Sequence, residues 1–123
     1  MSDCGVCLGE WDGDSPEFFD VRTPKARKPH SCSECGKVIA KGDVYQRTCG
    51  KNDGDFWTYD TCLICAEIRA AFSCNGESLG GMMWEDFRDY VFPEMTTTCF
   101  DRLKTPEAKA ELRRRWMEWK GLR

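Results

Sequence analysis

Two short runs of β-prone residues lie near the middle of the chain and predict a β-hairpin. Residues 44–48 (VYQRT) and 56–59 (FWTY) are rich in β-branched and aromatic side chains, and the Gly-, Asn- and Asp-rich stretch 50–55 separates them. Such runs, joined by turn-forming residues, are typical of paired strands. The hydrophobic period then changes, which indicates a helix after the hairpin. The residues at helical spacing are Cys62, Cys65, Ala66, Arg69 and Ala70, preceded by Thr61 as the expected N-cap.

Two more helices are predicted in the C-terminal part of the chain. The segment 82–92 (MMWEDFRDYVF) precedes Pro93, and its apolar side chains fall on one side of a helix. The last helix has clear boundaries, because Thr105 can cap it, Pro106 suits its first position and Gly121 can end it. The residues between them, 95–98, are expected to form a polar connector. The apolar positions are Met83, Phe87, Tyr90 and Val91 in the first helix, and Ala108, Leu112, Trp116 and Trp119 in the last.

A chain of 123 residues has room for one domain. We expect the main domain over residues 1–100, with its core at 30–75, and a C-terminal helix over 101–123 that packs on this domain or projects from it. The cysteines number nine, which is odd, and no apolar leader segment precedes them. These features favour a reducing compartment over a secreted disulfide scaffold, so we expect a cytoplasmic protein without a membrane span.

Charge is distributed in blocks, although the net charge is only −3. Residues 1–21, 22–51, 52–101 and 102–123 carry net charges of −6, +6, −8 and +5. Such blocks either form a dipolar surface or neutralise one another in the folded protein. A net negative charge argues against a protein whose main partner is a phosphate backbone. Nucleic-acid binding through Arg22–Lys28 and Arg113–Arg115 is therefore the alternative interpretation and not the first.

Two C-x-x-C pairs, Cys32/Cys35 and Cys62/Cys65, flank the predicted hairpin. Each pair can direct two sulfurs at one centre, and two pairs complete the tetrahedral shell that Zn²⁺ prefers in closed structural sites. The second pair lies at the start of the predicted helix, whose positive end favours thiolates. The alternative is that the four thiols are buried or redox-active without a metal. We predict a zinc site formed by these four cysteines.

The order of knuckle, β-hairpin and helix resembles the treble-clef family of zinc fingers, as does the cysteine spacing. Gly36 follows the first C-x-x-C pair, where a tight knuckle needs a residue that tolerates positive φ. The resemblance implies a small α+β metal-bound domain, here with additional C-terminal helices.

A third C-x-x-C pair, Cys4 and Cys7, needs ligands from elsewhere in the chain if it binds a second metal. The residues left for this purpose are His30, Cys49, Cys74 and Cys99. We prefer a second zinc site of Cys4, Cys7, His30 and Cys74, with Cys49 and Cys99 as small buried apolar side chains. His30 has an alternative role, which is to donate a hydrogen bond to a thiolate of the first site.

Several segments up to about Phe92 resemble a family of small uncharacterised proteins from tailed bacteriophages and prophages. The segments are CLGEWDGDSPEFF, TPKARKPHSCSECGKVI, KGDVY, TYDTCLICAEIRAAFSC and GGMMWEDFRDYVFP. The resemblance implies a phage-encoded zinc-binding accessory protein without an assigned reaction. It carries over the ligands Cys32, Cys35, Cys62 and Cys65, and it places Cys7, His30 and Cys74 at matching positions.

The available chemistry favours an interaction protein over an enzyme. A site closed by four thiolates has no open position for a reacting water. The single histidine excludes the HNH-type nucleases that share the treble clef, and no residue is assigned a catalytic role. We expect a non-enzymatic module that binds a bacterial host protein and inhibits a defence system. Its expected binding residues are Trp116, Trp119, Arg113, Arg114 and Arg115, although the tryptophans can instead belong to the core.

Overall fold

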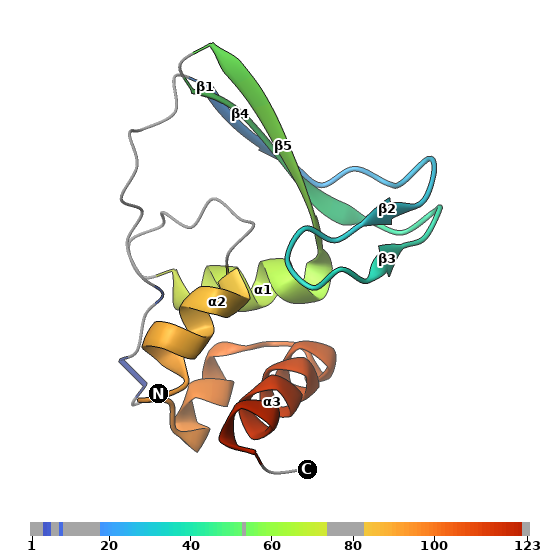
Figure 1. The fold of residues 1–123 in the computed structure, drawn as a ribbon. Helices are drawn as coiled ribbons and strands as arrows, with labels where there is room; N and C mark the ends of the chain where they lie inside the picture. Colours follow the sequence, from blue (N-terminus) through green and yellow to red (C-terminus); the bar gives the residue numbers. More distant parts are fainter. Residues whose placement is uncertain (1–3, 6–7, 9–17, 53, 74–82, 122–123) are drawn as a thin grey trace.

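The computed structural model describes residues 4–5, 8, 18–52, 54–73 and 83–121. A three-stranded sheet extends to one side of the molecule and the helices gather on the other, with a short hairpin beside them (Figure 1). This confirms the predicted α+β class. The strands are β1 (Phe18–Arg22), β2 (His30–Ser31), β3 (Val38–Ile39), β4 (Tyr45–Asn52) and β5 (Asp55–Cys62). The helices are α1 (Leu63–Phe72), α2 (Met83–Asp86), the π-helix η1 (Phe87–Val91), the 3₁₀ helix η2 (Thr97–Arg102) and α3 (Pro106–Lys120).

Strands β4 and β5 form the predicted hairpin but are longer than predicted. Their register pairs Tyr45 with Cys62, and Gly54 near the hairpin end has a φ of 86°. The sequence predicts a turn over 50–55, whereas Gly50 lies within β4 opposite Trp57. A Cβ at Gly50 would collide with the Trp57 ring, so this glycine permits close cross-strand packing and does not form a turn.

Strand β1 was not predicted. It pairs antiparallel with β4, so the sheet has the strand order β1-β4-β5. The basic segment Arg22–Lys28 therefore starts at a strand end, and its Ala26 is buried. The Ala26 N–H donates to the Asp43 carbonyl at 2.8 Å, which holds this segment against the turn before β4. A five-residue strand of this kind is defined by its partner, which is far away in sequence.

Helix α1 contributes the centre of the core. Its Ile68 and Phe72 are fully buried, and it packs against α3, whose Leu112 is also fully buried. Phe72 also starts a chain of neighbouring rings that continues to the surface. Ring centroids are 5.1 Å apart for Phe72 and Phe87, 5.6 Å for Phe87 and Phe92, and 5.9 Å for Phe92 and Trp119.

The predicted helix over 82–92 is divided into α2 and the π-helix η1. The Phe92 N–H donates to the Phe87 carbonyl at 2.7 Å, five residues earlier, which widens the turn. The prediction that Tyr90 faces the core is wrong, since its side chain is 56% exposed. The predicted polar connector also differs, because Met95 is buried and η2 begins at Thr97.

Helix α3 begins and ends where predicted. The Ala108 N–H donates to the Thr105 hydroxyl at 3.2 Å, Pro106 is the first helical residue, and Gly121 has a φ of 79°. Helix α1 starts one residue later than expected, with Cys62 and not Thr61 at the N-cap. None of the helices in the described ranges is both long and apolar enough to cross a membrane.

Candidate metal centre and candidate binding surface

Four cysteines converge at the junction of β5, α1 and the β2–β3 loop. The sulfurs of Cys32, Cys35, Cys62 and Cys65 all lie within 4.8 Å of one another. Sulfurs bound at about 2.3 Å from a zinc ion in a tetrahedron are about 3.8 Å apart. The Cys35 and Cys62 sulfurs are separated by 3.9 Å, close to this spacing. The cluster therefore fits a metal ion, and the predicted four-cysteine grouping is confirmed.

A tight turn between β2 and β3 positions the first two sulfurs. The Cys32 N–H donates to the Lys37 carbonyl, and the Gly36 N–H donates to the Cys32 carbonyl, both at 2.9 Å. Gly36 has a φ of 76°, which favours glycine, as the sequence predicts. The turn is joined to β5 through Ser33, whose N–H donates to the Asp60 carbonyl at 2.7 Å.

The other two sulfurs come from the end of β5 and the first turn of α1. Cys62 has an extended backbone at the helix N-cap, and Cys65 lies one turn into the helix. The Cys62 N–H points at the Cys32 sulfur, at a distance of 3.4 Å. An N–H donor and a helix N-terminus both stabilise negative charge on sulfur, so this position suits thiolate ligands.

Hydrogen bonds among the sulfurs move the pKa values of three of these cysteines apart. Thiol hydrogen bonds from Cys62 and Cys65 lower the pKa of Cys32 far below its ordinary value. Donation to Cys32 raises the pKa of Cys62 to about 11 and also raises the pKa of Cys65. All four cysteines can be thiolates together only if a cation is bound, because four adjacent thiolates repel one another.

A buried ion pair braces the metal centre and was not anticipated from the sequence. The Arg69 guanidinium of α1 donates to the Glu34 carboxylate of the knuckle at 3.1 Å. Both side chains are almost completely buried. Arg69 also donates to Gln46 at 2.6 Å and to Thr61 at 3.3 Å. One arginine thus links the knuckle, both strands of the hairpin and α1.

His30 lies among sheet residues. Its Nδ1 is 3.4 Å from an Asp60 carboxylate oxygen, and its ring is 5.1 Å from that of Tyr45. Asp60 also accepts from the Arg47 guanidinium at 3.0 Å. Strand β2, which contains His30, and residues 4–5 are drawn at opposite sides of the molecule (Figure 1). The predicted placement of His30 beside Cys4 in a second metal site is therefore wrong.

Cys4 is bonded to Cys99 of η2, across 95 residues of chain. The sulfur predicted as a metal ligand is thus held in a disulfide, and Cys99 is not merely a buried apolar side chain. The other two predicted ligands of this site, Cys7 and Cys74, lie outside the described residues, so their assignment stays a prediction. Cys49 is a half-buried free thiol in β4, where the Thr58 hydroxyl lies 3.8 Å from its sulfur.

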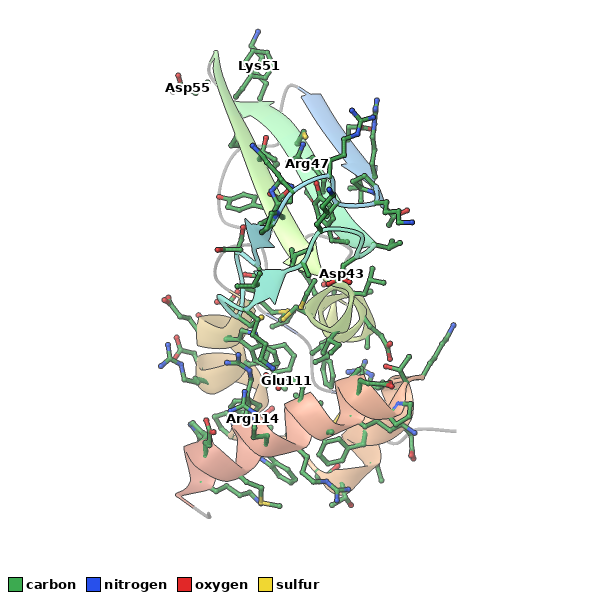
Figure 2. The ribbon with its side chains drawn as sticks, turned by 90° about the vertical axis from the view of Figure 1, so that its right-hand side faces the viewer. Asp43, Arg47, Lys51, Asp55, Glu111 and Arg114 are labelled. Carbon is green, nitrogen blue, oxygen red and sulfur yellow. A yellow bond between two sulfur atoms is a disulfide. The ribbon has the colours of Figure 1, made fainter. Side chains whose placement is uncertain are left out.

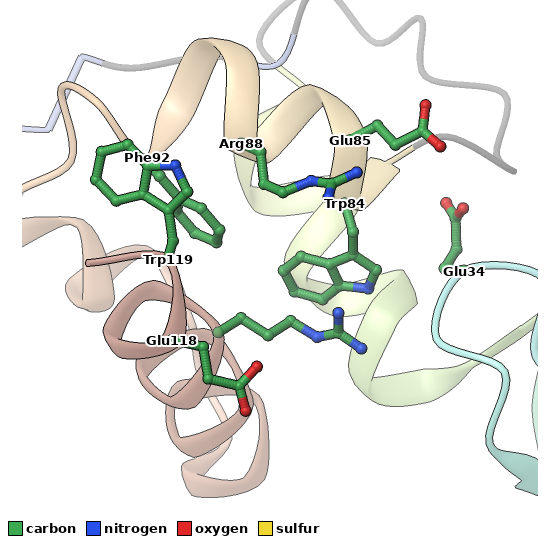
Figure 3. Close-up of a pocket in the computed structure, with 8 residues that line it drawn as sticks. Glu34, Trp84, Glu85, Arg88, Phe92, Glu118 and Trp119 are labelled. Atoms are coloured by element: carbon green, nitrogen blue, oxygen red, sulfur yellow. The ribbon is translucent and has the colours of Figure 1, made fainter. Parts of the chain in front are cut away.

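A hollow of about 470 Å³ lies between α3 and the segment formed by α2 and η1. Trp119 and Phe92 lie together at one end, Trp84 lies in the middle, and Glu85 and Glu34 lie toward the other end (Figure 3). The Arg115 guanidinium covers the Trp84 ring, with 4.1 Å between its central carbon and the ring centroid. The buried Trp84 indole N–H has no hydrogen-bond partner among the described residues.

The two tryptophans of α3 have different environments. Trp116 is only 5% exposed and packs with Phe100, so its predicted role in binding a partner is wrong. Trp119 is 43% exposed and lines the hollow. The difference follows from helix geometry, since a step of three residues rotates the side chain by about 60° away from the buried face.

The arginine run of α3 is largely used within the molecule. Arg113 lies over the Phe100 ring at 5.3 Å. Arg114 and Arg115 each donate to the Glu111 carboxylate at 2.7 Å, and Lys37 reaches it at 3.4 Å. Glu111 lies on the side of α3 that faces the rest of the molecule, with Arg114 beside it (Figure 2). Of the three predicted binding arginines, Arg115 is the one that lines the hollow.

This network predicts a pH-dependent contribution from Glu111. Burial alone would raise the pKa of Glu111, but hydrogen bonds from Arg114 and Arg115 lower it to about 2. A depressed carboxyl pKa contributes stability that is present above about pH 4.5 and is lost as pH falls toward 2. We expect Glu111→Gln to lower the free energy of unfolding by roughly 1.5–3 kcal/mol at pH 7. Urea unfolding should show that the difference in unfolding free energy between Glu111→Gln and the parent becomes smaller below about pH 4.5.

Glu118→Gln is the matched control, because Glu118 pairs with Arg114 at 2.7 Å on the exposed side of the same helix. Exposed pairs contribute about 0–1 kcal/mol, so this variant should differ little from the parent at any pH. If the difference in unfolding free energy between Glu111→Gln and the parent stays constant between pH 7 and pH 3, Glu111 does not make this pH-dependent contribution.

A second hollow, of about 550 Å³, has a basic lining. Lys25, Arg27 and Lys41 surround it together with Pro24, Ala26 and Gly42. The backbone brings Lys41 to the Arg22–Lys28 segment, since the Gly42 N–H donates to the Ala26 carbonyl at 2.8 Å. Part of the predicted basic segment is thus gathered at one place, with a lysine that the sequence analysis did not associate with it.

No protein-family model, no curated protein sequence and no solved structure matches the chain.

Proposed function

We propose that the four-cysteine cluster is a structural zinc site and that the surrounding knuckle, hairpin and helix form a treble-clef-like finger. The donor set supports zinc, because four thiolates in a closed tetrahedral arrangement are typical of structural zinc sites. Bound zinc would supply the charge that holds the thiolates together. In this role Cys32, Cys35, Cys62 and Cys65 fix the β2–β3 loop to the start of α1, and the metal takes part in no reaction.

We propose further that the protein is a non-enzymatic interaction module. One observation carries this proposal, which is the hollow beside α3 with the half-exposed Trp119 at its end. Aromatic side chains next to arginine are enriched where proteins bind one another. From the resemblance of several segments to phage proteins, we propose a phage origin and a bacterial host protein as the partner, with inhibition of a host defence system as the outcome.

The lining of the hollow indicates what the partner presents. Trp119 and Phe92 offer apolar ring surface, which suits an inserted apolar or aromatic side chain. Three glutamates, Glu34, Glu85 and Glu118, line the hollow with Arg88 and Arg115, so its charged groups do not single out a partner of one sign. An apolar or aromatic side chain of the partner therefore matches the aromatic end of the hollow.

A pull-down from bacterial lysate, followed by binding measurements with the purified captured protein, tests this proposal. We expect Trp119→Ala to abolish capture while the melting temperature stays near that of the parent, because the ring is only partly buried. Trp57→Ala is the control, since Trp57 lies on β5, away from the hollow. Capture that survives Trp119→Ala would refute a binding role for the hollow.

Nucleic-acid binding is the second candidate, and the basic hollow favours it. Lys25, Arg27 and Lys41 would contact phosphate groups, whereas Arg114 and Arg115 of the other predicted segment are paired with Glu111. Phosphate contacts weaken steeply with added salt, because binding releases counterions. Nuclease treatment of the lysate and a salt titration distinguish nucleic-acid binding from protein binding in the same experiment. Loss of capture after nuclease treatment and also at high salt supports a nucleic-acid partner.

A further inference from the structure

We propose that Cys4 is a modification site, at which an anionic low-molecular-weight thiol opens the Cys4–Cys99 disulfide and forms a mixed disulfide with Cys4. This inference does not depend on the binding surface proposed above. The bond joins two sulfurs of different accessibility, because Cys99 is fully buried in η2 whereas Cys4 is only partly buried. A thiolate must reach the sulfur that it attacks, so Cys4 is the sulfur that is open to exchange.

A positive charge lies beside this accessible sulfur. A guanidinium nitrogen of Arg102 is 3.7 Å from the Cys4 sulfur. The central carbon of the same guanidinium lies 4.9 Å from the centroid of the buried Phe72 ring, and this contact holds the group in place. The attacking species in thiol–disulfide exchange is a thiolate, and a nearby positive charge attracts it together with any other negative charge that it carries. The position of Arg102 therefore favours anionic thiols over cationic ones.

The buried sulfur has a donor for the charge that it acquires. The Thr96 hydroxyl lies 4.0 Å from the Cys99 sulfur. When the disulfide breaks, its electron pair stays on Cys99, and a hydroxyl donor stabilises this thiolate until it takes up a proton. A stabilised thiolate leaves faster, so the Thr96 hydroxyl assists the same step that Arg102 promotes at Cys4.

The first step exchanges one disulfide for another without net oxidation or reduction. The incoming thiolate forms a bond to the Cys4 sulfur, the Cys4–Cys99 bond breaks, and Cys99 leaves as a thiolate and takes a proton from solvent. A second small thiolate then attacks the sulfur of the first, which releases Cys4 as a thiolate beside Arg102. Over both steps, two small thiols are oxidised to a disulfide and the protein disulfide is reduced to two thiols.

Opening the bond would remove a covalent link between segments that are 95 residues apart. Leu8 would then hold this part of the chain by noncovalent contacts, since it is buried and its N–H donates to the Phe72 carbonyl at 2.9 Å. The thiol state of the surroundings would therefore set how firmly the chain near Cys4 is attached to the helices.

The test compares how fast an anionic thiol, mercaptoethanesulfonate, and a cationic thiol, cysteamine, open the bond in the folded, zinc-saturated full chain at low salt. We expect Arg102→Met to lower the ratio of the anionic rate to the cationic rate roughly fivefold or more, because a unit charge about 4 Å away changes each interaction by about that factor in water. Arg102→Lys should keep most of the preference, and added salt should weaken it. Arg22→Met is the control, since β1 lies at the other end of the molecule from residues 4–5 (Figure 1).

Peptide mass mapping gives a readout that does not depend on rates. The mixed disulfide should be found at Cys4, with Cys99 alkylated by a trapping reagent, while circular dichroism shows that each variant is folded. An adduct at Cys99 would overturn the proposal, as would a rate ratio that Arg102→Met leaves unchanged. Opening that is no faster than global unfolding would also overturn it, and so would a folded parent, isolated without reductant, in which both cysteines are free thiols.

Discussion

Replacing Cys32 by serine should unfold the centre of this protein. Bound zinc contributes roughly 10–16 kcal/mol in zinc-finger peptides at neutral pH, whereas whole domains are stable by only about 5–15 kcal/mol. Cys32 is buried, and the Cys62 N–H points at its sulfur, so a serine there removes a ligand that no neighbouring group replaces. Far-UV circular dichroism and zinc content should fall together, and a strong chelator should have the same effect on the parent.

Cys49→Ser is the matched control for this substitution, because Cys49 is a free thiol outside the cluster. It should retain the metal of the four-cysteine centre and the thermal midpoint of the parent. If Cys32→Ser melts at the same temperature as the parent, with equal metal content, the four-cysteine site is not what stabilises the fold.

The second large effect should come from the buried pair of Glu34 and Arg69. Replacing either partner alone, as in Arg69→Met, leaves a buried charge without compensation, which typically costs about 3–5 kcal/mol. Replacing both partners with methionine should recover part of this loss, since no charge is then buried. Urea unfolding of zinc-saturated protein measures both changes.

Arg88→Met is the control for the same chemical change at an exposed position. Surface substitutions of this kind usually alter stability by less than about 0.5 kcal/mol. If Arg69→Met costs no more than Arg88→Met, the pair does not brace the knuckle.

The four-cysteine cluster was predictable because its information is local. Each C-x-x-C pair fixes two sulfurs within one turn, and Gly36 and the hairpin between the pairs show how the turns meet. The boundaries of α3 were predictable for the same reason, because Thr105, Pro106 and Gly121 act within one helical turn.

Contacts between distant segments could not be predicted in this way. Strand β1 depends on β4, and the partner of Cys4 lies 95 residues away, so neither leaves a periodic signal. Arg69 did leave a signal that was not used. It shares the buried face of α1 with Cys65, Ile68 and Phe72, and a charged residue on such a face requires a buried partner.

Helix α1 connects the proposed metal site with the proposed binding surface. It is ten residues long, which corresponds to about 15 Å. Its first turn holds Cys65, and Phe72 at its other end begins the ring chain that reaches Trp119. A partner seated on Trp119 would therefore restrain the helix that carries two of the zinc ligands, and because coupling between binding free energies is reciprocal, the partner should raise the affinity for the metal in an equilibrium competition with a chelator. A metal affinity that the partner leaves unchanged would show that the two ends of α1 act independently.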